Sequence, residues 1–126
     1  MYAIVNGLKL FYHKEGSGRP VILLHGNGED HTIFDVAIRD LARSYTVYAL
    51  DSRAHGKSVP VPSLTYREMA EDVAAFIRQQ GLEKPALVGF SDGGVVALLV
   101  ALRWPDLPGR LVVAGAHMTP AGLKQP

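Results

Sequence analysis

Residues 89–93 read Gly-Phe-Ser-Asp-Gly and lie between an apolar stretch typical of a buried strand and a Gly- and Ala-rich segment typical of a helix. Gly-x-Ser-x-Gly in this position indicates a tight strand-to-helix turn with a serine at its tip. We expect Gly89 and Gly93 to occupy points where a Cβ would collide with crowded backbone. The turn therefore favours a fold in which strands lead directly into helices.

The rest of the chain repeats this alternation of strand and helix patterns. Short apolar runs predict buried strands, and apolar side chains at helical spacing predict the helices between them. Thr65 and Glu68 form a capping box for one of these helices. The pattern predicts strands at 21–24, 45–50, 86–90 and 111–116 and helices at about 32–43, 66–80 and 92–103. Such alternation favours a mostly parallel sheet with right-handed crossovers.

The N-terminus follows a different pattern. Residues 2–5 and 8–13 predict two short strands, and Asn6-Gly7 between them readily supplies the positive φ angles of a two-residue hairpin turn. We therefore predict an α/β fold that opens with an antiparallel hairpin and has helices flanking the sheet.

Composition excludes several classes of function. A chain of 126 residues predicts one domain, residues 1–126, and its 13 basic and 12 acidic residues are dispersed, so no nucleic-acid partner is expected. No apolar run is long enough to span a membrane, and the first twenty residues do not resemble a signal peptide. The absence of cysteine fits a reducing compartment, so we expect a cytoplasmic location. No membrane partner is expected.

Two more polar segments follow predicted strands. They are His-Gly-Asn-Gly at 25–28 and Asp-Ser-Arg-Ala-His-Gly-Lys-Ser at 51–58, and ligands bind at the carboxyl edge of parallel strands. Together with 89–93 they resemble the α/β-hydrolase family, in its branch of esterases and lactonases with HGxG-like, DxRGxGxS and GxSxGG motifs. The order and spacing match the N-terminal half of that family over essentially the whole chain. Ala54 departs from the usual glycine.

The resemblance implies a serine hydrolase that acts on carboxylic esters or related small acyl substrates without a cofactor. Ser91 would be the nucleophile, and the backbone N–H groups of Asn27 and Asp92 would form the oxyanion hole. Asp92 also begins a helix, whose N-terminus favours negative charge. His25 and Gly26 would support the loop, because the family's HG histidine orients it and does not take the serine's proton. Gly89 and Gly93 would support the turn.

Residues 51–58 admit two interpretations. Asp51, Arg53 and Ser58 either contact substrate or form an internally hydrogen-bonded loop, and we favour the loop, because Asp and Ser readily bond to nearby backbone. His13, His31 and His55 are expected on the surface or in loops, since no spacing among them resembles a zinc site. No metal is expected.

The resemblance also indicates what this chain lacks. In the family the catalytic acid follows the sixth or seventh strand and the base follows the eighth, but after Ser91 only Asp92, Asp106 and His117 are candidates. Asp106 is expected at the far side of the sheet. A Ser91–His117 dyad stays open as an alternative, although a non-catalytic loop residue is more usual at position 117.

We therefore expect the N-terminal half of a hydrolase, truncated after about the sixth strand and impaired or inactive alone. Strand 111–116 would then be an apolar sheet edge, which predicts a homodimer paired through this strand, or aggregation. An alternative function is a non-catalytic binding or assembly module whose open edge pairs with another chain. A nucleotide-binding domain is less favoured, since no phosphate-binding glycine motif is present.

Overall fold

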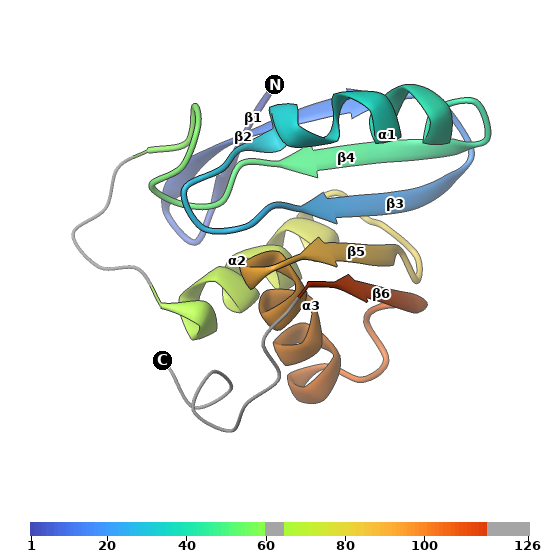
Figure 1. Ribbon diagram of the computed structural model, residues 1–126. Coiled ribbons are helices and arrows are strands. Elements are labelled where there is room, and N and C mark those ends of the chain that lie inside the picture. Colours follow the sequence, from blue (N-terminus) through green and yellow to red (C-terminus); the bar gives the residue numbers. More distant parts are fainter. Residues whose placement is uncertain (60–64, 116–126) are drawn as a thin grey trace.

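A computed structural model describes residues 1–59 and 65–115. It contains a six-stranded sheet in the order β1-β2-β4-β3-β5-β6 (Figure 1). From β4 to β6 all neighbouring strands are parallel, whereas β1 and β2 are antiparallel to their neighbours. This confirms the predicted mostly parallel sheet with an N-terminal hairpin. The strands are β1 (Tyr2–Val5), β2 (Leu8–Glu15), β3 (Arg19–Leu24), β4 (Tyr45–Leu50), β5 (Ala86–Phe90) and β6 (Arg110–Ala114).

The hairpin turn has the predicted geometry. Asn6 and Gly7 have φ angles of 51° and 79°, as a type I′ turn requires. The second strand continues to Glu15, two residues beyond the prediction, because His13 to Glu15 pair with β4. At the other end of the sheet, β6 ends at Ala114, and the predicted residue 116 lies outside the described residues.

Among the described residues three α-helices pack on the sheet, and one predicted helix needs correction. They are α1 (Asp35–Leu41), α2 (Tyr66–Gln79) and α3 (Asp92–Arg103). The helix expected over 32–43 begins as a separate 3₁₀ turn, η1 (His31–Phe34), because the Asp30 carboxylate accepts a hydrogen bond from the Thr32 N–H and starts a tighter turn. Ile33, an apolar residue of the helical pattern predicted over 32–43, lies in η1 and is 43% exposed.

The helices cover the two sheet faces unequally. α2 and α3 cover one face along with the larger apolar core, whereas α1 covers the other face at β4 (Figure 1). The start of α2 is confirmed, since the Glu68 N–H donates to Thr65 Oγ1 at 3.1 Å. Over β5 and β6, the α1 face carries no described helix.

A buried ion pair ties the loop after β4 to α2. The guanidinium of Arg53 donates to both carboxylate oxygens of Asp72, at 2.7 and 2.8 Å, and to Glu68 Oε2 at 2.9 Å. Hydrogen bonding to Asp72 is the main cause that raises the pKa of Arg53. Asn6 Nδ2 also donates to Asp72. The ion pair therefore joins hairpin, loop and helix, and sequence reasoning missed the burial of Asp72.

Replacing Asp72 tests the contribution of this ion pair. Asp72→Ala should lower the free energy of unfolding by about 3 kcal/mol, because it leaves the buried Arg53 with only the more exposed Glu68. Glu71→Ala is the matched control: it removes an exposed 3.5 Å pair with Arg103 and should cost under about 1 kcal/mol. Urea unfolding measures both, and equal losses would refute the role of the buried pair.

Candidate active site

Ser91 occupies the sharp turn between β5 and α3. Its φ and ψ angles are 57° and −120°, a left-handed conformation that costs a residue with a Cβ about 1–3 kcal/mol. The Ser91 N–H donates to the carbonyl of Ala114 at 2.8 Å, and its own carbonyl accepts from the Gly94 N–H at 2.9 Å. The surrounding backbone thus holds the serine in a strained turn.

Two glycines make that turn sterically feasible. A Cβ on Gly89 would collide with the Gly93 carbonyl oxygen, and one on Gly93 would collide with the carbonyl oxygen of Leu24 and lie 2.6 Å from that of His25. Neither set of obstacles is a flexible side chain. This confirms the steric role expected for Gly89 and Gly93, and it shows that α3 starts in contact with the end of β3.

The loop after β3 passes directly beside the serine. A Cβ on Gly26 would lie 3.1 Å from the Ser91 Cβ. The Gly26 N–H donates to Glu29 Oε1 at 2.8 Å, and its carbonyl accepts from the Glu29 N–H at 3.2 Å. Glu29 therefore closes the loop, and Gly26 permits the close approach. Sequence reasoning identified Gly26 and missed Glu29.

His25 uses both ring nitrogens to hold this loop. Nε2 accepts from the Ser52 N–H at 3.0 Å, so Nδ1 carries the proton and donates to the Gly26 carbonyl at 2.7 Å. Burial is the main cause that lowers the pKa of His25, which favours the neutral ring. His25 links the loops after β3 and β4, and neither of its ring nitrogens bonds to Ser91.

His55 makes a second bridge between the same loops. Its Nε2 accepts from the Gly28 N–H at 3.0 Å, so its Nδ1 donates to the Arg53 carbonyl at 2.9 Å. The His25 and His55 ring centroids lie 5.1 Å apart. We expected His55 merely in a loop. Its position at the carboxyl edge was the only signal in the sequence for this role.

The loop over 51–58 is internally hydrogen-bonded, as predicted. The buried Asp51 carboxylate accepts from the His31 N–H at 2.8 Å and the Lys57 N–H at 2.9 Å, and Ser58 Oγ donates to the Asp51 carbonyl at 2.7 Å. Ala54 has a φ of 63°, where the resembling family has glycine. The turn therefore keeps its left-handed residue without the glycine.

Asp51 also belongs to a cluster with Asp30 and His31. One ligand atom from each lies within 4.8 Å of the others. These carboxylates already accept hydrogen bonds from backbone N–H groups, His31 N–H to Asp51 and Thr32 N–H to Asp30. Through these hydrogen bonds the cluster stabilises the loops.

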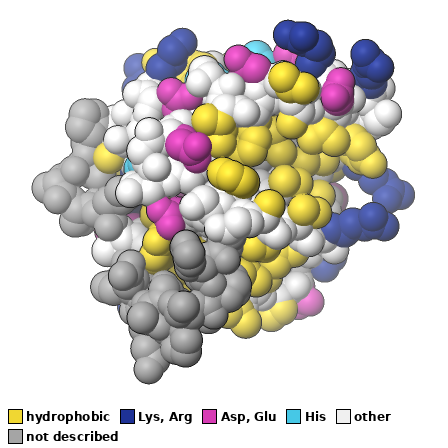
Figure 2. Space-filling model, viewed as in Figure 1, with side chains coloured by type: hydrophobic (Ala, Val, Ile, Leu, Met, Phe, Trp, Pro, Cys, Tyr) yellow, Lys and Arg dark blue, Asp and Glu magenta, His cyan; other side chains and the backbone are white. Residues whose placement is uncertain are grey.

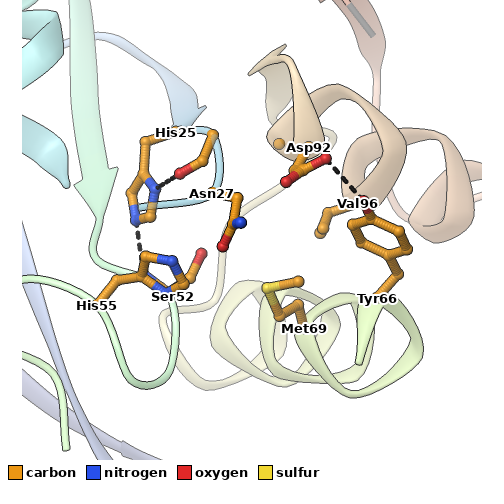
Figure 3. Close-up of a pocket in the computed structure, with 10 residues that line it drawn as sticks. His25, Asn27, Ser52, His55, Tyr66, Met69, Asp92 and Val96 are labelled. Carbon is orange, nitrogen blue, oxygen red and sulfur yellow. Dashed lines mark hydrogen bonds between the residues drawn. The ribbon is translucent and has the colours of Figure 1, made fainter. Parts of the chain in front are cut away.

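A cavity of about 240 Å³ lies next to the serine turn. Figure 3 shows side chains from α2, from α3 and from the loops after β3 and β4 around one space. Ser91 itself lies beside the lining residues, between Asp92 and the loop at Gly26. The lining residues are His25, Gly26, Asn27, Ser52, His55, Tyr66, Met69, Asp92, Gly93 and Val96.

Two ionisable side chains that line the cavity, those of Tyr66 and Asp92, are hydrogen-bonded to each other. The Tyr66 hydroxyl at the start of α2 donates to Asp92 Oδ1 at 2.7 Å (Figure 3). This hydrogen bond, followed by burial and the charge of Asp92, raises the pKa of Tyr66 to about 12. The pair holds the two helix N-termini together beside Ser91. Sequence reasoning named only the backbone of Asp92 and gave no signal for Tyr66.

The candidates for the base and the acid fall elsewhere. His117 lies outside the described residues. The Asp106 carbonyl accepts from Lys84 Nζ at 2.6 Å, and the following Gly109 N–H donates to the Pro85 carbonyl, just before β5 begins. Asp106 therefore lies at the amino edge of the sheet, opposite Ser91, as expected.

Comparison with known proteins identifies the family. Residues 19–125 match the family described as alpha/beta hydrolase fold. The chain belongs to this family. It is 33% identical over 120 residues to the human serine hydrolase BPHL, and 37% identical over 123 residues to an acetyltransferase component of the acetoin cleaving system from Cupriavidus necator. An esterase structure from Exiguobacterium antarcticum matches with a TM-score of 0.88 and 32% identity.

The chain spans less than half the length of these relatives. The matches cover 90%, 96% and 92% of this hydrolase-family chain, but only 41% of BPHL, 32% of the acetyltransferase component and 45% of the esterase. Over 1–59 and 65–115, no helix is long and apolar enough to cross a membrane.

The pair between Tyr66 and Asp92 predicts an unusual tyrosine titration. One of the five tyrosines should ionise near pH 12, and Asp92→Asn should bring its pKa back toward about 10 by removing the negative charge. Because folding raises this pKa, the pair stabilises the fold fully below about pH 10, and the stabilisation is lost as pH rises through 12. Phenolate absorbance measures the titration.

Tyr66→Phe is the control for this assignment, since it deletes the titrating group and keeps the ring. If the titration near pH 12 persisted in Tyr66→Phe, or if Asp92→Asn left it unchanged, the pair would not be its cause.

Proposed function

We propose that Ser91 is the nucleophile of a serine hydrolase that acts on carboxylic esters or related acyl substrates. The observation that carries this proposal is the strained turn itself, with φ of 57°, at the edge of a cavity of about 240 Å³. Strain at one residue in such a turn is typical of sites where it fixes a reactive side chain. The hydrolases among the relatives support the same class of reaction.

The proposed oxyanion hole consists of the Asn27 and Asp92 N–H groups. As the first residue of α3, Asp92 has an N–H without an intrahelical acceptor, at the positive end of the helix dipole. The Asn27 N–H has no hydrogen-bond acceptor among the described residues. When Ser91 attacks a carbonyl, these two donors, one from the loop after β3 and one from the start of α3, would stabilise the negative charge on its oxygen.

The hydrogen bonds of His25 and His55 indicate that this chain alone has low hydrolase activity. Both nitrogens of His25 and of His55 are engaged with backbone, so neither is placed to take the Ser91 proton. In this proposal His25 and Gly26 support the loop, and the base and acid come from elsewhere. A hydrolase without its base retains only the oxyanion hole and binding effects.

Labelling with a fluorophosphonate tests the nucleophile. We expect slow labelling at Ser91 whose rate rises steadily with pH up to about pH 9, because without a base the serine proton passes to solvent. Ser91→Ala should abolish the label, located by mass spectrometry. Ser52→Ala, which removes the other serine at the cavity, should leave it intact.

Two results would change this proposal. A label that persists in Ser91→Ala, or no label in folded protein, would refute the nucleophile. A rate that levels off near the pKa of histidine would mean that a base is supplied, by His117 or by a second chain.

A second candidate function is assembly through the open edge of the sheet. Within the described chain β6 is the last strand of the sheet, and no strand pairs with its outer side. The Ala114 carbonyl accepts from Ser91 on the inner side, so strand alternation places the Val113 N–H on the outer side. A row of unpaired backbone groups favours pairing with a second copy.

Sedimentation at micromolar concentration tests this pairing. We expect dimers or larger species in the wild type, and a shift to monomer in Val113→Pro, which deletes an outward N–H that only a partner would use. Val113→Thr keeps the N–H and is the matched control. A monomeric wild type would exclude the pairing.

A further inference from the structure

The loop after β3 contains a four-residue turn that Glu29 closes twice. The Glu29 N–H donates to the Gly26 carbonyl at 3.2 Å, which closes a β-turn over residues 26–29. Gly28, at the third position of this turn, has a φ of 77°, as a type II turn requires. The Glu29 side chain adds a second closure, since its Oε1 accepts from the Gly26 N–H at 2.8 Å. Glu29 therefore bonds to both backbone polar groups of Gly26.

The other backbone donors of this turn are not equivalent. The Gly28 N–H donates to His55 Nε2 at 3.0 Å, so a side chain from the loop after β4 holds the second half of the turn. The four N–H groups of the turn thus have acceptors at Gly26, Gly28 and Glu29, whereas that of Asn27 has none among the described residues. Figure 3 shows Asn27 and His55 on one side of the cavity. The anchored turn leaves one donor available there.

The Glu29 carboxylate lies close to Ser91. A Cβ on Gly26 would lie 2.6 Å from Glu29 Oε1 and 3.1 Å from the Ser91 Cβ, so both side chains lie against the same point of the backbone. A negative charge at this place opposes the negative charge that develops on a carbonyl oxygen during acyl transfer. The charge of Glu29 therefore gives the reaction no advantage, and the use of this side chain lies in its hydrogen bond.

We propose that Glu29 is a positioning residue for the oxyanion hole: it fixes the turn in the conformation that leaves the Asn27 N–H free beside Ser91. The inference rests on the proposed function of Ser91. A donor that is fixed in advance needs no rearrangement when the oxyanion forms. Without the Glu29 side chain, the Gly26 N–H loses its acceptor, and the 3.2 Å backbone bond alone closes the turn.

The rate of fluorophosphonate labelling at pH 8 tests this role, because the phosphonyl oxygen of the probe takes the place of the carbonyl oxygen. Glu29→Ala should slow labelling of Ser91 about tenfold, somewhat less than the loss of a complete oxyanion donor. Glu29→Gln should restore the rate to within about twofold of wild type, since an amide oxygen still accepts from the Gly26 N–H.

The glutamine variant separates positioning from proton transfer. A glutamate that took the serine proton would lose its effect in Glu29→Gln as fully as in Glu29→Ala, because an amide is not a base at pH 8. Glu83→Ala is the matched control, since Glu83 is an exposed carboxylate just before β5, at the amino edge of the sheet, and its removal should leave the rate unchanged. Circular dichroism confirms that each variant is folded.

Amide hydrogen exchange, followed by NMR, measures the turn without using the chemistry of Ser91. In the wild type the Gly26 N–H should exchange more slowly than the Asn27 N–H, which has no acceptor in the described chain. Glu29→Ala should speed exchange at Gly26 about tenfold, and Glu29→Gln should keep it slow.

The outcomes distinguish this inference from the proposed function. If Ser91 is labelled but Glu29→Ala is not slower, or if Glu29→Gln is as slow as Glu29→Ala, the positioning role is wrong and the nucleophile stands. Absence of label at Ser91 in the wild type refutes the proposed function, and the exchange data then decide whether Glu29 fixes the turn: equal exchange at Gly26 in the wild type and Glu29→Ala would overturn that as well.

Discussion

The candidate site depends on close contacts between backbone segments, which glycine permits because it has no side chain. The start of α3 contacts the end of β3 at Gly93, where a Cβ would collide with the Leu24 carbonyl oxygen, and the loop after β3 contacts the turn through Gly26. These approaches bring the loop after β3 and the start of α3 next to Ser91. The strained φ of Ser91 persists because the neighbouring strands and α3 determine the path of the chain on both sides.

The loops around the serine are held by polar side chains that do not themselves touch it. His25 and His55 each bridge the loops after β3 and β4, and each uses one nitrogen as donor and the other as acceptor. Arg53 then ties the second loop to α2 through Asp72. Because both ring nitrogens of each histidine are already hydrogen-bonded, the network positions the loops and leaves neither His25 nor His55 free to act on Ser91.

Local patterns in the sequence predicted most of the fold and the centre of the site. Asn6-Gly7 predicted the turn because positive φ is a local property, and the spacing of Gly89, Ser91 and Gly93 predicted the strained turn for the same reason. Apolar runs predicted every strand of the parallel sheet. The 3₁₀ turn at 31–34 was missed, because the Asp30 cap competes with the helical pattern that follows it.

Contacts between distant residues were not predictable in this way. Tyr66 and Asp92 are 26 positions apart, and Arg53 and Asp72 are 19 apart, so no periodicity links either pair. Asp72 lies within the apolar side of α2, where a carboxylate contradicts the pattern until its partner is known. Such a contradiction is itself informative, because a buried carboxylate requires a cation from elsewhere in the chain.

The carboxyl and amino edges of the sheet differ in how many of their polar and charged side chains have partners. At the carboxyl edge the polar groups of the loops are paired with one another, and Asn27 and Asp92 line one small cavity. At the amino edge Arg19, Lys84 and Arg110 form no ion pair with a carboxylate of the described residues, and Val112 on the last described strand is 52% exposed. Within the described residues, the histidines around Ser91 therefore have hydrogen-bond partners for both ring nitrogens, while exposed apolar and cationic side chains gather at the opposite edge of the sheet (Figure 2).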